Sequence, residues 1–158
     1  MTTLARQGLR VDYFIIIAAG TLVAMQAGTN ATMQKSLQNP FISSAVSFAG
    51  GLLSLLIALA IYMALNKTPL PRVHQWASAP WWAWTGGALG AIYVLAGVLT
   101  VEKVGTGMFV CLSVTASILA SLAIDHFGLV GMHRHVASPG RLIGGALMVL
   151  GIILIGRF

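Results

Sequence analysis

The chain has 158 residues, of which 58% are hydrophobic and 8% are charged, and its mean hydropathy is +0.89. About a quarter of the residues in a soluble globular domain are charged, so this composition excludes that class and indicates an integral membrane protein. The formal net charge of +6 does not indicate nucleic-acid binding, because the nine Lys and Arg residues are scattered between apolar blocks and form no patch.

Five segments are long and apolar enough to cross a hydrocarbon core as helices, which takes roughly 20 residues each. We predict them at residues 12–35, 41–65, 81–101, 104–124 and 141–157, within a single membrane domain that covers residues 1–158. A basic N-terminus followed by an apolar run is also typical of a cleavable signal peptide, but the four further apolar segments favour a retained first span. The sequence therefore predicts an all-α bundle of five transmembrane helices.

The first predicted span carries three amides, Gln26, Asn30 and Gln34, which stand four residues apart and would share one helix face. An amide without a partner in hydrocarbon costs several kcal/mol, whereas a hydrogen bond between membrane helices recovers only about 0.6–2 kcal/mol. This comparison favours a face that lines a wet cavity. The alternative is that Gln34 lies at the headgroups and that the other two amides bond to serines of neighbouring helices.

The connection between the second and third spans is the longest polar one, and its prolines exclude a continuous helix: Pro69, Pro71 and Pro80. All four tryptophans of the chain gather around the start of the third span, at Trp76, Trp81, Trp82 and Trp84. Tryptophans are enriched where membrane helices meet water, so these four predict an interfacial belt.

The fourth span has Ser113, Ser117 and Ser121 at four-residue spacing, and Asp125 continues this face next to His126. Such a carboxylate and imidazole pair could bind and release a proton near physiological pH. An equally open alternative is that Asp125 caps the helix end or forms a salt bridge with Arg141. The single cysteine, Cys111, lies in an apolar run of this span and excludes an intrachain disulfide.

Several stretches resemble the YdcZ-like family of half-size proteins in the drug/metabolite transporter superfamily. They are the amide face of the first span, "SFAGG" at 47–51, "PWWAWTGGALGAIYV" at 80–94, "SLAIDHFGLVG" at 121–131 and "SPGRLIGGALMVLGIILI" at 138–155. The resemblance implies half of a ten-helix transporter in the bacterial inner membrane, whose inverted repeat is completed by an antiparallel dimer with itself or with a paired homologous subunit. One departure is Ala116-Ser117, where a Gly-Gln pair often stands in the family.

The basic residues give a modest orientation signal. With five spans, six Lys or Arg residues fall on the side of the N-terminus (Arg6, Arg10, Lys67, Arg72, Arg134 and Arg141) and three on the other side (Lys35, Lys103 and Arg157). Positive loops stay in the cytoplasm, so a cytoplasmic N-terminus is favoured. The small bias is also compatible with dual topology.

No catalytic arrangement is recognisable, since His126 adjoins Asp125 and the sequence has no Gly-x-Ser-x-Gly elbow or phosphate-binding loop. His133 and His135 form a His-x-His that no nearby carboxylate or cysteine completes as a metal site. We therefore predict no enzyme activity, no cofactor and no metal ion.

A transporter subunit that moves a small polar solute fits these features best. We expect its cavity to be lined by six residues: Gln26, Asn30, Gln34, Phe48, Tyr93 and Ser117. Small multidrug exporters hold cations with a glutamate in the first helix, but residues 13–101 of this chain contain no acid, which favours a neutral or zwitterionic solute. The alternatives are a proton-coupled cation exporter that uses Asp125 and His126, and a non-transporting accessory subunit whose amides only join helices.

Overall fold

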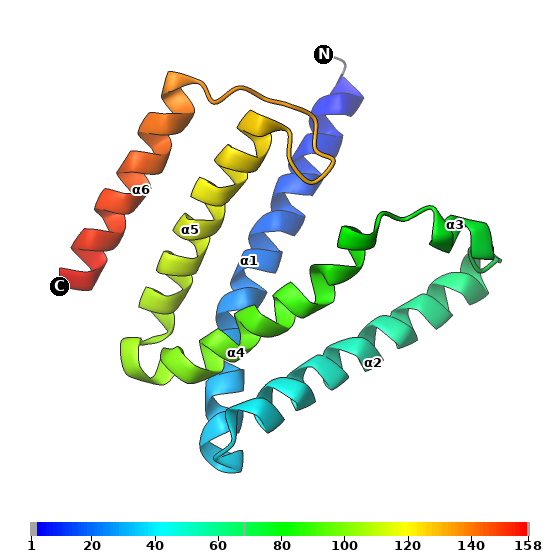
Figure 1. The fold of residues 1–158 in the computed structure, drawn as a ribbon, viewed down its shortest axis with the longest axis horizontal. Helices are drawn as coiled ribbons and strands as arrows, with labels where there is room; N and C mark the ends of the chain where they lie inside the picture. Colours follow the sequence, from blue (N-terminus) through cyan, green and yellow to red (C-terminus); the bar gives the residue numbers. More distant parts are fainter. Residues whose placement is uncertain (1–2, 68, 158) are drawn as a thin grey trace. The chain divides into compact units, whose positions relative to one another are not determined.

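The computed structural model describes residues 3–67 and 69–157, with side chains described from residue 12 onward. The described residues form helices and contain no strand (Figure 1). The elements are α1 (Thr3–Leu37), α2 (Pro40–Asn66), α3 (Val73–Ala77), the 3-10 helix η1 (Trp81–Thr85), α4 (Gly86–Val104), α5 (Thr106–Phe127) and α6 (Pro139–Arg157).

Five stretches of the described chain are long and apolar enough to cross a membrane: Asp12–Leu37, Pro40–Asn66, Trp81–Val104, Thr106–Phe127 and Pro139–Arg157. The predicted all-α class with five spanning helices is confirmed. The ends of these five stretches differ from the predicted ends of the spans by at most three residues. The prediction of one domain over the whole chain stays a prediction.

The turn between α1 and α2 is set by the sequence Gln38-Asn39-Pro40. Gln38 adopts a left-handed backbone conformation with φ +50°, which ends α1. The Asn39 side chain then accepts hydrogen bonds from the backbone N–H groups of Phe41 (3.0 Å) and Ile42 (3.1 Å). Pro40 starts α2, where its missing N–H costs nothing and its fixed φ suits a helix. Two membrane helices are thus joined with only two residues between them.

Glycines with positive φ end two other helices. Gly105, with φ +84°, separates α4 from α5 by a single residue, so that α4 runs to Val104 and α5 starts at Thr106. Gly128, with φ +65°, ends α5 just beyond Phe127. A residue with a Cβ is disfavoured in this left-handed region, which is why glycine is common at helix ends.

The chain divides into two compact units, one made of the described parts of 1–26 and 101–158 and the other of residues 27–100. In the first unit α5 and α6 lie side by side and antiparallel, joined by the loop 128–138 (Figure 1). Gly145 is buried there, and a Cβ at this position would lie 3.2 Å from Leu119 Cδ2 and 3.6 Å from Leu122 Cδ1. The missing side chain thus lets α6 approach the leucines of α5.

The second unit contains the end of α1, together with α2, α3, η1 and α4. Its most buried residues are small or medium in size: Ala27, Asn30, Ala31, Ser43, Ser44, Val94, Gly97 and Val98. Small residues at these positions allow helix backbones to approach closely, which replaces the hydrophobic drive that lipid does not supply.

The prolines do exclude a continuous helix in the connection between α2 and α4, as predicted, but this connection contains two short helical elements. α3 begins after Arg72, whose backbone N–H donates to the Gln75 side chain at 2.7 Å. η1 begins after Pro80, whose carbonyl accepts from the Ala83 N–H at 3.0 Å.

Candidate functional site

The three predicted cavity amides belong to the same helix, α1, at one-turn spacing. Gln26 is exposed and falls in the first unit, whereas Asn30 and Gln34 fall in the second. Asn30 is only 6% exposed, and Gln34 is half-buried. The exposure of this helix face therefore falls from Gln26 to Asn30, which is one helical turn further along α1.

Asn30 meets α2 through its backbone. The Ser43 hydroxyl, which is fully buried, donates a hydrogen bond of 3.2 Å to the Asn30 carbonyl oxygen. Most other hydroxyls in the membrane helices bond a carbonyl of their own helix three or four residues earlier, as Thr32 does at 3.0 Å. The contact between α1 and α2 at this point thus depends on Ser43 and the main chain, and does not need the amide of Asn30.

The Asn30 side-chain amide itself has no hydrogen-bond partner among the described residues. The same part of the chain leaves no fully buried side-chain nitrogen or oxygen without a partner. The amide therefore keeps some accessible surface, although the residue as a whole is almost buried. It can donate and accept hydrogen bonds with water or with a small molecule.

The two aromatic residues of the predicted cavity wall lie in the second unit. A Cβ placed on Gly90 of α4 would be 3.4 Å from Cζ of Phe48, so the Phe48 ring covers this glycine. Tyr93 follows Gly90 by three residues and lies on the same side of α4. Phe48 and Tyr93 are each 38% exposed. The structure thus places Phe48 against the helix that carries Tyr93.

Ser117, the sixth predicted cavity residue, lies in the first unit on α5. Its hydroxyl donates to the carbonyl oxygens of Ser113 (2.8 Å) and Val114 (2.9 Å), both in its own helix. Ser113 and Ser121 bond back to α5 in the same way, at 2.7 Å and 2.9 Å. The hydroxyls of these serines are thus hydrogen-bonded within α5, and their small side chains keep this side of the helix slim.

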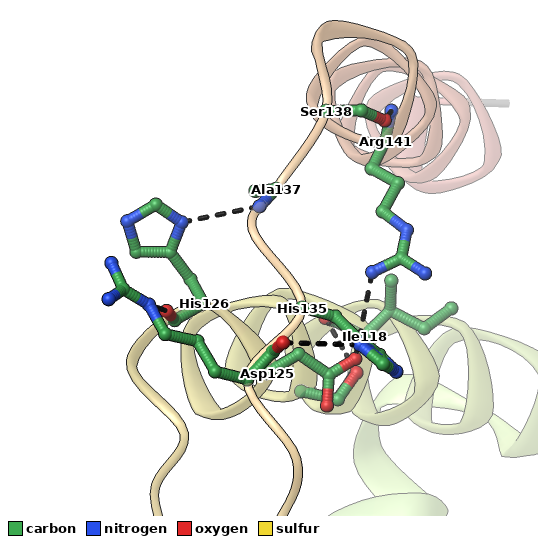
Figure 2. A network of polar contacts seen from close by, with 9 residues as sticks. Ile118, Asp125, His126, His135, Ala137, Ser138 and Arg141 are labelled. Carbon is green, nitrogen blue, oxygen red and sulfur yellow. Dashed lines mark hydrogen bonds and ion pairs between the residues drawn. The ribbon is translucent and has the colours of Figure 1, made fainter.

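Asp125 and His126 lie in a polar network at the end of α5 (Figure 2). The Asp125 carboxylate pairs with the Arg141 guanidinium at 3.8 Å, with 38% and 46% of the two side chains exposed. The His126 ring accepts a hydrogen bond of 3.2 Å from the Ala137 backbone N–H through Nδ1. The ion pair to Arg141, one of the two alternatives for Asp125, is therefore present, and proton coupling stays a prediction.

The loop 128–138 also covers the carbonyl groups at the end of α5. The His135 N–H donates to the Asp125 carbonyl oxygen at 2.8 Å, and Arg134 Nε donates to that of His126 at 3.0 Å. Helix ends leave their last carbonyls without partners inside the helix, so such contacts stabilise the end of α5. The sequence gives little sign of them, because the donors lie eight and ten residues further along the chain, in a loop without a repeating pattern.

The histidines of this loop form no visible metal site. His135 Nδ1 lies 3.3 Å from the Arg134 carbonyl oxygen. Among the described residues, no group of three His, Cys, Asp or Glu side chains is placed to hold a metal ion. The arrangement at this helix end therefore offers hydrogen bonds and one ion pair.

The comparisons with known proteins give one match. The model of a family described as "Putative inner membrane exporter, YdcZ" matches residues 12–154, which is nearly the whole chain. No curated protein and no solved structure matches the chain.

Proposed function

The chain belongs to the YdcZ family of inner membrane exporters, and we propose that it is a subunit that carries a small neutral or zwitterionic polar solute past the amide face of α1. Membership makes it a membrane transporter in its general class. The solute, the path and the assembly are the content of the proposal.

One observation carries the proposal: the Asn30 amide is nearly buried in a membrane helix, yet has no partner among the described residues. An amide that served only to join helices would be hydrogen-bonded across the interface. At this site the Ser43 hydroxyl and the Asn30 carbonyl already make that bond. The amide is thus available to a solute, and polar residues of this kind in a membrane span commonly mark a substrate route.

The proposal that the solute carries no net charge rests on the lack of acidic residues between Asp12 and Glu102. Residues 13–101, which cover the first two spanning helices from Tyr13 on and the third as far as Val101, contain no Asp or Glu. A lipophilic cation needs a carboxylate in a region of low dielectric, because a neutral amide supplies no compensating charge. Amides and hydroxyls instead recognise neutral polar groups by hydrogen bonds, and the rings of Phe48 and Tyr93 would supply an apolar wall.

The number of spans supports an antiparallel dimer. Five helices cannot be divided into two equal halves, whereas alternating access in many transporters uses two inverted repeats that move against each other. A second copy or a paired homologous subunit in the opposite orientation would supply the missing repeat. Cysteines introduced near each end of the chain, in a Cys111→Ser background, test this by labelling from outside intact cells. If every protomer of the active complex has one orientation, the antiparallel arrangement is wrong.

The transport proposal is tested in proteoliposomes with a panel of labelled neutral amino acids, monosaccharides and polyols. Asn30→Leu should lower the apparent affinity for the transported solute about fivefold, the equivalent of one lost hydrogen bond of about 1 kcal/mol. It should leave assembly unchanged, because leucine has a similar size and the Ser43 bond uses the main chain. Ser43→Ala is the matched control, and it should weaken packing without changing solute preference.

A second candidate is a proton-coupled cation exporter, in which the adjacent Asp125 and His126 would carry the proton; the Asp125 side chain is 38% exposed despite its pair with Arg141. Its test is growth of a drug-sensitive host on quaternary ammonium dyes. Strong protection by this chain alone, lost in Asp125→Asn, would replace the neutral-solute proposal. Full transport by Asn30→Leu and Gln26→Leu would instead return the amides to a role in helix packing.

A further inference from the structure

The connection between α2 and α4 forms two adjoining hollows within the second unit. The first, which we call the tryptophan slot, has a volume of about 330 Å³ and is lined by Trp76, Ala79, Ala83 and Trp84. The second, the arginine slot, has a volume of about 690 Å³ and is lined by Pro69, Leu70, Arg72 and His74. Pro71 and Gln75 line both, so an apolar hollow and a basic hollow share one wall.

Local contacts hold this shared wall in place. The Trp76 and Trp84 rings stack with their centroids 5.9 Å apart and their planes at 25°. The Trp76 indole N–H donates to the Pro71 carbonyl oxygen at 3.2 Å, and Gln75 accepts from the Arg72 N–H at 2.7 Å. These contacts fix α3 and η1 against each other, and the two elements together form the tryptophan slot.

The charge around the arginine slot has one sign. Arg72 is exposed, and its guanidinium has no partner among the described residues. Lys67 and His74 lie within five residues of it along the chain, and residues 13–101 contain no acid. A planar guanidinium binds phosphate through two parallel N–H bonds. The arginine slot is thus complementary to a phosphate group.

We propose that the two slots together bind one anionic phospholipid, with its phosphate on Arg72 and an acyl chain along Trp76 and Trp84. A soluble phosphate compound would leave the tryptophan slot empty, whereas a phospholipid carries a phosphate and an apolar chain on the same molecule. The location fits, because η1 opens the spanning segment Trp81–Val104 and tryptophans of membrane proteins favour the headgroup level. The site is separate from the amide face of α1 and does not depend on the transported solute.

The tryptophans supply the probe for this site. All four lie between residues 76 and 84, so the tryptophan fluorescence of the whole chain reports on this segment alone. The full-length protein is reconstituted in phosphatidylcholine vesicles that contain a minor fraction of brominated phosphatidylglycerol, or of brominated phosphatidylcholine as the zwitterionic comparison without net charge. Bromine quenches tryptophan on contact. One cation near anionic lipid strengthens binding about fivefold, and we expect an apparent preference of this size for the anionic lipid.

Three variants make the test specific. Arg72→Gln should abolish the preference, so that the anionic and the zwitterionic lipid quench equally, and Arg72→Lys should retain part of the preference because the charge remains. Arg157→Gln is the matched control, because it removes another exposed arginine, at the far end of the chain, and should change nothing. Soluble glycerol phosphate should not relieve the quenching. Equal quenching by both lipids, an equal loss in Arg157→Gln, or displacement by soluble glycerol phosphate would each overturn the proposal.

Discussion

Gly145 offers the sharpest test of how α5 and α6 pack. A Cβ at this buried position would lie 3.2 Å from Leu119 Cδ2, which is tighter than an ordinary contact, and 3.6 Å from Leu122 Cδ1. Gly144, the preceding residue, has nothing within 4 Å of the same position. The two glycines therefore form a matched pair on one helix. We expect Gly145→Val to force the helices apart and Gly144→Val to have little effect on their packing.

The size of the effect follows from overpacking. Extra methyl groups in a well-packed interface cost about 1–3 kcal/mol. In a chain of this length 1 kcal/mol corresponds to roughly 2–4 °C in Tm, so Gly145→Val should lower Tm by about 2–12 °C. Gly145→Ala should cost less, because the Leu119 side chain needs to move by only a few tenths of an ångström.

Cys111 is a built-in reporter for this measurement. It is the single cysteine of the chain, is half-buried on α5, and lines a pocket shared with Met148 and Gly151 of α6. A dye that fluoresces on reaction with a thiol, followed during heating in detergent, therefore detects the separation of these two helices. The reasoning is refuted if Gly144→Val lowers Tm as much as Gly145→Val, or if Gly145→Val leaves Tm unchanged.

Thermal unfolding followed by circular dichroism, which reports on all helices, checks three further changes. Asn39→Ala should cost about 1 kcal/mol, because it removes the side-chain acceptor that caps α2, and an unchanged Tm would argue against this cap. Gly128→Ala should cost about 1–2 kcal/mol, because alanine is strained at φ +65°; a neutral result would mean that α5 ends differently. Asp125→Asn should cost less than about 1 kcal/mol, because its ion pair with Arg141 is long and partly exposed. A double-mutant cycle with Arg141→Gln measures the coupling directly, and a value well above that limit would contradict this assignment.

The spanning helices were predictable because membrane thickness fixes how many apolar residues each must contain. Their exact ends were less so. The sequence predicts that the third span ends at 101 and that the fourth begins at 104, whereas α4 continues to Val104 and only Gly105 separates it from α5. A polar pair such as Glu102 and Lys103 looks like a loop in a hydropathy pattern, but both residues are compatible with a helix.

The candidate site was predictable in part. Gln26, Asn30 and Gln34 are four residues apart in the sequence, and helix geometry then places them on one face of α1. The different burial of these amides depends on which residue of α2 meets α1, and the fully buried Ser43 has no signal in the sequence that sets it apart from Ser47. Likewise, the contact of Ala137 with His126 depends on the path of a loop, which no periodic pattern describes.

The central claim is that the amide face of α1 borders a water-filled path. The most direct measurement is the reaction of single cysteines with a water-soluble, membrane-impermeant methanethiosulfonate in lipid vesicles, with Gln26→Cys, Asn30→Cys, Gln34→Cys and the off-face control Thr32→Cys placed in a Cys111→Ser background. Our account predicts reaction at all three amide positions, protection of position 30 by the transported solute, and little reaction at Thr32→Cys. Reaction at Gln34→Cys alone would place only that residue at the headgroups and contradict a path along α1.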